Sequence, residues 1–234
     1  MAATKLTPDG WSGSSSGVWN NKANIVINDG QGITVSGSDL IDAFAGDDEV
    51  IGFRKSGAGV TVPRDPRRGN LQLGGGDDRL SGTSQQDHGI DNRGFIYTGE
   101  GNDRITGSGA KTALRNHGFI FTQGGKDVVD VRDGGISGKK KHFVDLGADR
   151  DLFIGFGQHY LYGGGGEDLL LLPKGTYTID RRSSRRFRVE KGKDRLELVD
   201  FEQVGSIDGG RNERISIDKS GTLVVKANGD INFS

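Results

Sequence analysis

The sequence contains no cysteine, which excludes disulfide bridges, thiolate metal sites and a cysteine nucleophile. Long hydrophobic runs are also missing: no segment has the length and apolar character of a membrane-spanning helix, and residues 1–30 hold no apolar stretch of signal-peptide length. Neither sign of charge dominates, because 31 Lys and Arg stand against 32 Asp and Glu, a formal net charge of -1. No global field therefore directs the protein toward nucleic acid or a membrane surface.

Apolar residues are scarce and glycine is abundant. The hydrophobic content is 32% and the mean hydropathy is -0.53, values that would fit a disordered chain. However, 41 of the 234 residues are glycine, against a usual share of roughly 7%, and only 4 are proline. No Gly-X-Y period is present, so a collagen helix is excluded. The composition instead indicates a fold with many tight turns at positive φ or with closely stacked backbones.

The sequence repeats internally. The segment 94–105 aligns without a gap with 118–129, and an aspartate at a fixed place extends the alignment to six degenerate copies. The six aspartates are Asp48, Asp78, Asp103, Asp127, Asp151 and Asp168. Below, residues at the same offset from these aspartates are called a column.

Two columns of the repeat are entirely apolar. Seven positions before the aspartates lie Ile41, Leu71, Ile96, Ile120, Val144 and Leu161. Two positions after them lie Val50, Leu80, Ile105, Val129, Phe153 and Leu170. Glycine dominates the columns two and four positions before. Each copy therefore predicts a strand, a glycine-rich turn with a fixed aspartate, and a second strand, units that bury their apolar faces only by stacking into a continuous core.

The spacings between the aspartates predict how many sides the coil has. They are 30, 25, 24, 24 and 17 residues, whereas two strands and two tight turns need about 18. The longer copies have room for a third short strand, supplied by Val60–Val62, Ile90, Leu114 and Ile136. We therefore expect an all-β fold, a right-handed parallel β-helix or β-roll of about six coils, three-sided over most of its length and near minimal in its last coil.

The turns resemble the Gly-Gly-x-Gly-x-Asp-x-apolar-x nonapeptide of RTX (repeats-in-toxin) proteins. The segments 73–80 (Leu-Gly-Gly-Gly-Asp-Asp-Arg-Leu) and 98–105 (Thr-Gly-Glu-Gly-Asn-Asp-Arg-Ile) carry the resemblance best. It extends over about residues 40–172 and departs from the family in never placing two nonapeptides in tandem. The resemblance implies secretion and calcium binding between stacked turns, through aspartate carboxylates and backbone carbonyls.

Carried over by position, the ligands implied for Ca²⁺ include the turn glycines Gly76 and Gly101 together with the six aspartates. Asp48, Asp78 and Asp103 are the stronger candidates, and Asp127, Asp151 and Asp168 the weaker ones. The residue just before each aspartate sets this order, since it runs Asp47, Asp77, Asn102, Lys126, Arg150 and Glu167. A positive charge beside the fourth and fifth sites disfavours a cation there, and a ladder of ion pairs is the alternative interpretation.

Histidines suggest a different function. His142 and His159 share the column nine positions before the aspartate, and His117 lies one position earlier among cationic residues. This edge is either a groove for an acidic polysaccharide or a small anionic ligand, with histidines able to transfer protons, or simply a solvated edge. No Ser-His-Asp order, P-loop or His-Glu-x-x-His motif is present, so whether the chain is an enzyme stays open, with a non-enzymatic role favoured.

Two further sets of side chains have binding and structural interpretations. Aromatic residues in the columns six and eight before the aspartate face outward, and form either a strip for sugars or partners or a surface covered by another segment. An arginine-rich stretch, 181–193, predicts a hairpin tip able to hold phosphate, sulfate or uronate groups. No nucleic-acid motif accompanies it, and no nucleic-acid partner is expected.

The ends of the repeat set the expected domain boundaries. Residues 1–37 are expected to form N-terminal strands that lead into the coil, 38–172 the repeat helix, and 173–234 a β-rich cap continuous with it. The final Asp230–Phe233 segment resembles an uncleaved C-terminal secretion signal, which would place the protein outside the cell or on its surface. The leading hypothesis is therefore a secreted, calcium-binding structural or adhesive β-helix. A β-helix enzyme acting on an anionic polysaccharide (a lyase or epimerase) and a metal-free ligand-binding scaffold are the alternatives.

Overall fold

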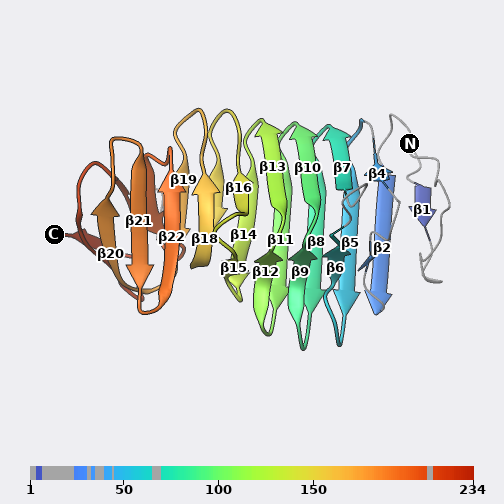
Figure 1. Ribbon diagram of the computed structural model, residues 1–234, viewed down its shortest axis with the longest axis horizontal. Helices are drawn as coiled ribbons and strands as arrows, with labels where there is room; N and C mark the ends of the chain where they lie inside the picture. Colours follow the sequence, from blue (N-terminus) through green and yellow to red (C-terminus); the bar gives the residue numbers. More distant parts are fainter. Residues whose placement is uncertain are drawn as a thin grey trace.

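The computed structural model describes residues 4–6, 24–30, 33–34, 40–43, 45–64, 70–209 and 213–234. Throughout these parts the chain is built from strands, and none of it forms a helix that could cross a membrane. The strands stack side by side along one long axis, with the N-terminal strands at one end and the C-terminal ones at the other (Figure 1). The prediction of an all-β, mostly parallel solenoid is confirmed.

Ladder I, defined as the strands that directly follow the repeat aspartates together with their N-terminal neighbour, is parallel throughout. Its members are β2 (Asn24–Gly30), β5 (Glu49–Arg54), β8 (Arg79–Ser84), β11 (Arg104–Gly109), β14 (Val128–Asp133), β17 (Leu152–Ile154) and β19 (Leu169–Leu172). Their equivalent residues are in register from coil to coil; for example, Leu80 pairs with Ile105 and Ile105 with Val129.

Ladder II contains the strands that lead into the Gly-Asp turns: β4 (Leu40–Asp42), β7 (Asn70–Gly75), β10 (Phe95–Glu100), β13 (Phe119–Gly124) and β16 (Phe143–Asp145). Ladder III is the predicted third side: β3 (Ile33–Thr34), β6 (Val60–Val62), β9 (His88–Asn92), β12 (Thr112–Asn116) and β15 (Ile136–Gly138). The longer coils therefore contribute three strands each, as the spacing predicts.

One strand explains the shortest coil. β18 (Gly157–Tyr162) pairs with β15 at its beginning and with β16 at its end, so it occupies both ladder III and ladder II. The corner between the two sides is absent there, and the spacing from Asp151 to Asp168 falls to 17 residues. Ladders II and III thereby join into a single hydrogen-bonded sheet beside ladder I.

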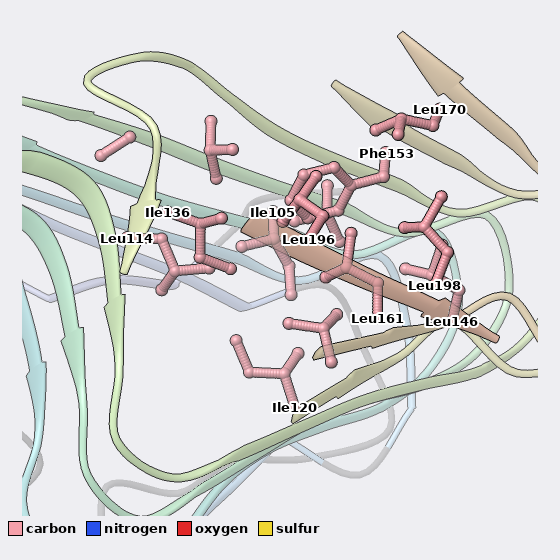
Figure 2. Close-up of a cluster of buried hydrophobic side chains, with 14 of the residues drawn as sticks. Ile105, Leu114, Ile120, Ile136, Leu146, Phe153, Leu161, Leu170, Leu196 and Leu198 are labelled. Atoms are coloured by element: carbon pink, nitrogen blue, oxygen red, sulfur yellow. The ribbon is translucent and has the colours of Figure 1, made fainter. Parts of the chain in front are cut away.

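The apolar columns form the core. Every member with a described side chain, from Leu71 to Leu161 in one column and from Val50 to Leu170 in the other, is 0% exposed. Ladder III adds Val60, Ile90 and Leu114, also fully buried, so three sides meet in one central cluster. Figure 2 shows this interior, where Ile105, Leu114 and Ile120 come from three different ladders. The side chain of Ile41 lies outside the described residues.

Two strands, β2 and β3, lie in the N-terminal region where strands that lead into the coil were expected. β2 pairs in parallel with β5, and β3 in parallel with β6, so each is stacked on a strand of the next coil. These strands therefore belong to a further coil that precedes the first Gly-Asp turn. The alignment missed it because its anchor was the aspartate. Much of the expected N-terminal region 1–37 lies outside the described residues.

The C-terminal part changes from parallel to antiparallel pairing. β22 (Asp194–Val199) continues the stack on β18 and pairs with β21 (Arg186–Lys191), which pairs with β20 (Gly175–Arg181). β20 also pairs with β25 (Gly221–Val225), and β25 with β26 (Ile231–Phe233). On the other side, β23 (Gln203–Ser206) stacks on β19 and pairs with β24 (Arg214–Ser216). This antiparallel layer covers the end of the parallel stack, the edge that would otherwise expose unpaired strands.

Candidate functional site

The Gly-Asp turns connect ladder II to ladder I and share one backbone conformation. The residue two positions before the aspartate has a positive φ in all six turns, for example 133° at Gly76 and 132° at Gly101. The residue four positions before has a positive φ in each of the five turns where the structure describes it, from Gly74 (110°) to Gly164 (101°). A Cβ at Gly101 would meet the carbonyl oxygen of Gly76 in the previous coil. Glycine is thus required here both by conformation and by close stacking.

Two turns keep this conformation without glycine. Gln123 has a φ of 71° and Asp149 a φ of 79°, and they occupy the two columns in which glycine dominates. A side chain at such a φ costs free energy that glycine does not. The stacked neighbours therefore impose the turn conformation even where the sequence opposes it.

The six aspartates form a continuous hydrogen-bonded ladder inside these turns. The backbone N–H of Asp48 donates to Oδ1 of Asp78 at 2.7 Å, and that of Asp78 donates to Oδ1 of Asp103 at 2.8 Å. The same bond, at 2.8–2.9 Å, joins Asp103 to Asp127, Asp127 to Asp151 and Asp151 to Asp168. All six residues are at most 2% exposed. The structure thus brings together all the aspartates that the repeat singles out.

Glu202 ends the ladder. The backbone N–H of Asp168 donates to Oε2 of Glu202 at 2.8 Å, so the longer glutamate side chain replaces the aspartate of a seventh coil. The glutamate immediately precedes β23, the strand that stacks on β19 after the last repeat turn.

The second carboxylate oxygen distinguishes this ladder from an ordinary turn motif. Oδ2 of Asp78, Asp103, Asp127, Asp151 and Asp168 is buried and has no hydrogen-bond partner. Buried polar atoms in folded proteins are nearly always paired, because an unpaired one loses its hydration without compensation. A bound proton or cation would compensate for the missing hydrogen bonds of these five atoms.

Burial shifts the protonation of the ladder. Loss of hydration raises the pKa of Asp78 and of Asp151 to about 8, and that of Asp127 to about 7. The same cause raises the pKa of Asp103 and of Asp168 to about 6. Neighbouring carboxylates of the ladder add to the rise at Asp78 and Asp151. Several of these groups are therefore protonated near neutral pH unless a cation binds.

Two inward-facing threonines lie in the same coils as the middle aspartates of the ladder, Asp103 and Asp127. The column five positions before the aspartate faces inward and carries Leu73 and Leu146, but Thr98 and Thr122 in the two coils between them, all at most 1% exposed. Their hydroxyls counteract part of the pKa rise at Asp103 and Asp127. The Thr122 proton nevertheless points to the carbonyl of Leu146 at 2.6 Å, so Oδ2 of Asp127 still lacks a donor.

The residues just before the aspartates form an outer ladder that runs the opposite way. The N–H of Asp77 donates to Oδ1 of Asp47 at 2.9 Å, and that of Asn102 to Oδ1 of Asp77 at 2.7 Å. The N–H of Lys126 donates to Oδ1 of Asn102 at 3.0 Å, and the outer ladder of side-chain oxygens ends there. Beyond it lies Arg150, 3.9 Å from a carboxylate oxygen of Glu167, a loose version of the anticipated ion pair.

No cluster of three or more acidic or histidine side chains in the described ranges could hold a metal ion by itself. A cation between two turns would therefore need backbone carbonyl oxygens in addition to carboxylates. Ca²⁺ takes six to eight oxygen ligands and accepts carbonyls, so the Gly-Asp turn supplies the right donor type. Gly76 and Gly101 place their carbonyls against the next coil, as the close approach of their stacked neighbours indicates.

The three histidines do not form one exposed edge. His159 is 2% exposed, and burial lowers its pKa to about 3, so its ring is neutral. Its Nε2 accepts from the side-chain amide nitrogen of Asn116 at 2.8 Å, and Oδ1 of Asn116 accepts in turn from the amide nitrogen of Asn92 at 2.8 Å. The ring reaches across the coil at Gly138, whose missing side chain leaves the space. His159 is thus the last member of a buried polar ladder that the sequence reasoning missed, although the 24-residue alignment of Asn92 with Asn116 was a signal for it.

His117 and His142 lie nearer the surface. Their rings are 6.4 Å apart, and His142 packs edge-on against Phe119 at 5.4 Å. Burial and nearby cations lower both pKa values. They are neutral at physiological pH, and His159 is too enclosed to join them at a substrate. A catalytic role for the three stays a hypothesis.

The outward aromatic residues of ladder II stack on one another. Phe95 lies 5.2 Å from Phe119, and Tyr97 lies 5.1 Å from Phe121, measured between ring centroids. Phe143 and Tyr162 extend the strip with edge-on contacts. All are half-buried. The contacts stabilise the coil-to-coil stack, as cross-strand aromatic pairs do in other sheets.

The arginine-rich hairpin exists as predicted, between β20 and β21. Three of its seven cations have carboxylate partners: Arg182 with Asp180, Arg185 with Asp200, and Arg188 with Glu197. These pairs leave less free charge at the tip than the sequence suggests.

Comparison with known proteins adds no family to this description. No protein-family model, no curated protein and no solved structure matches the chain.

Proposed function

We propose that this chain is a calcium-binding, RTX-like solenoid with a structural or adhesive role outside the cell or at its surface, in which Ca²⁺ ions lie between successive Gly-Asp turns. The observation that supports this function is the column of buried Oδ2 atoms without partners. A column of carboxylates buried at strand spacing is unfavourable when ionised, because each loses hydration and repels the next. A divalent cation between rungs removes both costs.

The early turns are the better sites. Their outer column carries Asp47, Asp77 and Asn102, which add negative charge or neutral oxygen next to Asp78 and Asp103. The later turns carry Lys126 and Arg150 at the same place, and these cations oppose a bound metal ion. Calcium therefore occupies the turns of Asp48, Asp78 and Asp103 first in this proposal.

Calcium-coupled folding also suits export. Inside a cell, where free calcium is scarce, the ladder would be held only by protons and the chain would be less stable. Outside, calcium would complete the turns. The C-terminal Asp230–Phe233 segment, which forms β26 in part, is the proposed secretion signal.

The test is thermal unfolding of the whole chain at pH 8, first in EDTA and then with calcium in excess. A site saturated at a hundred times its Kd adds about 2.7 kcal/mol, or roughly 5–10 °C for a chain of this length. We expect a rise of at least that size, accompanied by proton release, because ionised aspartates replace protonated ones. Magnesium, which demands smaller octahedral sites, is expected to have a weaker effect.

Asp78→Asn and Asp77→Asn make a matched pair. Both keep an oxygen that can accept the ladder hydrogen bond, but only the first removes a buried carboxylate. Asp78→Asn should lose much of the calcium response, whereas Asp77→Asn should keep most of it. If millimolar calcium neither changes the melting temperature nor releases protons, the ladder is stabilised by protons alone and the chain is a metal-free scaffold.

A further inference from the structure

A second feature, independent of the aspartate ladder, lies on the outer face of ladder I. Here a hollow of about 560 Å³ opens beside the turns of Asp127 and Asp151. Its apolar lining comes from Val128, Leu152 and Leu169, which are stacked neighbours on β14, β17 and β19. Three consecutive coils thus form one aliphatic strip about 10 Å long, at a strand spacing of roughly 4.8 Å. Val128 and Leu152 are partly exposed in it, whereas Leu169 is only 4% exposed.

The same row of ladder I is charged in the earlier coils. There it consists of Glu49, Arg79 and Arg104, which occupy the positions equivalent to Val128. Arg79 pairs with Glu49 at 3.3 Å, and Arg104 pairs with Asp130 at 2.9 Å. The aliphatic strip therefore begins where the charged row ends, and it is a local feature of the later coils.

Basic side chains surround the strip. Lys126 and Arg150 come from the outer column of two successive turns, and Arg214 comes from β24, which returns antiparallel beside β23. Cations thus approach the hollow from both sides. Arg214 is 64 residues from Arg150 and 88 from Lys126 in the sequence, so only the fold brings it to them.

These cations are poorly neutralised. Among the residues that the structure describes, Lys126 and Arg214 form no ion pair, and Arg150 has only the exposed Glu167 at 3.9 Å. Asp130, on β14, is already shared by Arg104 and Arg132. Asp127 and Asp151 line the hollow, but their side chains are buried in the ladder. The hollow therefore presents three cations with little ion pairing beside an apolar floor.

We propose that this hollow binds an amphiphilic organic anion, with its carboxylate or phosphate group at Lys126 and Arg150 or Arg214 and its alkyl chain on Val128, Leu152 and Leu169. Charge complementarity selects an anion, and the aliphatic floor selects one with a hydrocarbon chain over a bare inorganic ion. Neither calcium nor the ladder carboxylates take part. The proposal thus holds or fails separately from calcium binding.

The experiment is titration calorimetry of the full chain with decanoate in EDTA, below the concentration at which decanoate forms micelles. Acetate, inorganic phosphate and decanol serve as probes that each lack one half of the ligand. We expect saturable decanoate binding and much weaker binding of the three others. Equal binding of acetate or phosphate would overturn the proposal, as would equal binding of decanol or no decanoate binding at all.

Variants locate the site. Lys126→Asn copies the residue that the previous coil carries at this column, and Arg150→Gln removes the second charge. Each is expected to weaken decanoate binding by about two- to five-fold, the size of an exposed ion pair, and Leu152→Asn by a similar factor. Lys140→Gln, an exposed lysine on another side of the coil, is the matched control and should leave binding unchanged. Binding that is insensitive to the three site variants would contradict the assignment.

The same variants separate two sources of the ligand. Vesicles of phosphatidylglycerol present the anion at a membrane surface, whereas decanoate presents it free in solution. If the chain binds vesicles and Lys126→Asn weakens this binding, the ligand is a lipid headgroup and its chain. If it binds decanoate but not vesicles, the ligand is a soluble acid.

Discussion

The turns around Asp48, Asp78 and Asp103 and those around Asp127, Asp151 and Asp168 have the same backbone arrangement but different outer surfaces. In both sets the ladder hydrogen bonds measure 2.7–2.9 Å and the aspartates are buried. The early turns carry Asp47, Asp77 and Asn102 outside, whereas the later ones carry Lys126, Arg150 and Glu167. Inward residues and glycines therefore specify the stack, and the outer columns are free to specify binding.

The largest expected effect on stability comes from a substitution that opposes the turn conformation found in both sets. Gly166 has a φ of 138°, and a Cβ there would meet the carbonyl of Asp149, so Gly166→Ala should cost at least about 3 kcal/mol of unfolding free energy. Its neighbour Gly165 has nothing within 4 Å of a Cβ, so Gly165→Ala should change stability by less than about 0.5 kcal/mol. Urea unfolding of both variants measures this, and equal costs would show that the stack tolerates rearranged turns.

The next effect is a dependence on pH. Because the folded-state pKa values of Asp78 and Asp151 are raised to about 8, the folded chain binds more protons than the unfolded chain between pH 4 and 8. The stability that the two groups contribute is therefore complete below about pH 4, the pKa of an unfolded aspartate, and is lost as the pH rises toward 8. Melting in EDTA across this range should show a steady fall, and Asp78→Asn and Asp151→Asn should each make it shallower.

Repeating the pH-dependent melting experiment with calcium present compares the two sets of turns. With calcium present, the fall with pH should shrink, because the cation replaces the protons of the early ladder. Asp78→Asn should then reduce the calcium response more than Asp151→Asn does. An identical response in the two variants would contradict the assignment of calcium to the early turns.

The smallest effect concerns the glycines that the later turns lack. Gln123→Gly relieves a side chain held at a φ of 71° and is expected to stabilise the chain by about 0.5–1 kcal/mol. Asp149→Gly should gain less, because aspartate tolerates this conformation better than glutamine does. Gln158→Gly, in the extended β18, is the control and should destabilise by a similar amount. A loss of stability in Gln123→Gly would mean that the side chain makes compensating contacts.

The sequence predicted the parts of the fold that repeat. The two apolar columns and the third strand at Ile90 and Leu114 were correct, because periodic burial leaves a periodic signal. N-terminal strands were expected where β2 and β3 lie, but not that they form a further coil, because that coil has no Gly-Asp turn to anchor an alignment. Their parallel pairing with β5 and β6 is a long-range feature without a local signal.

The candidate sites were predictable to different degrees. The aspartates of the ladder follow from the repeat, but the direction of each carboxylate does not, so the unpaired Oδ2 atoms had no sequence signal. His159 was expected at a polar edge and is buried, because Gly138 in the neighbouring coil leaves room for its ring. The cationic hollow depends on Arg214, which arrives on a returning antiparallel strand after the repeat has ended.

The corner between ladder III and ladder II has a consequence for engineering. It spans seven residues between β6 and β7, two between β9 and β10, two between β12 and β13, four between β15 and β16, and none within β18. The aspartate ladder keeps its register through all these lengths. Foreign peptides inserted at the Lys139–Lys141 corner would thus be displayed at a fixed position along the axis, which makes the solenoid a scaffold for presenting several loops at defined spacings.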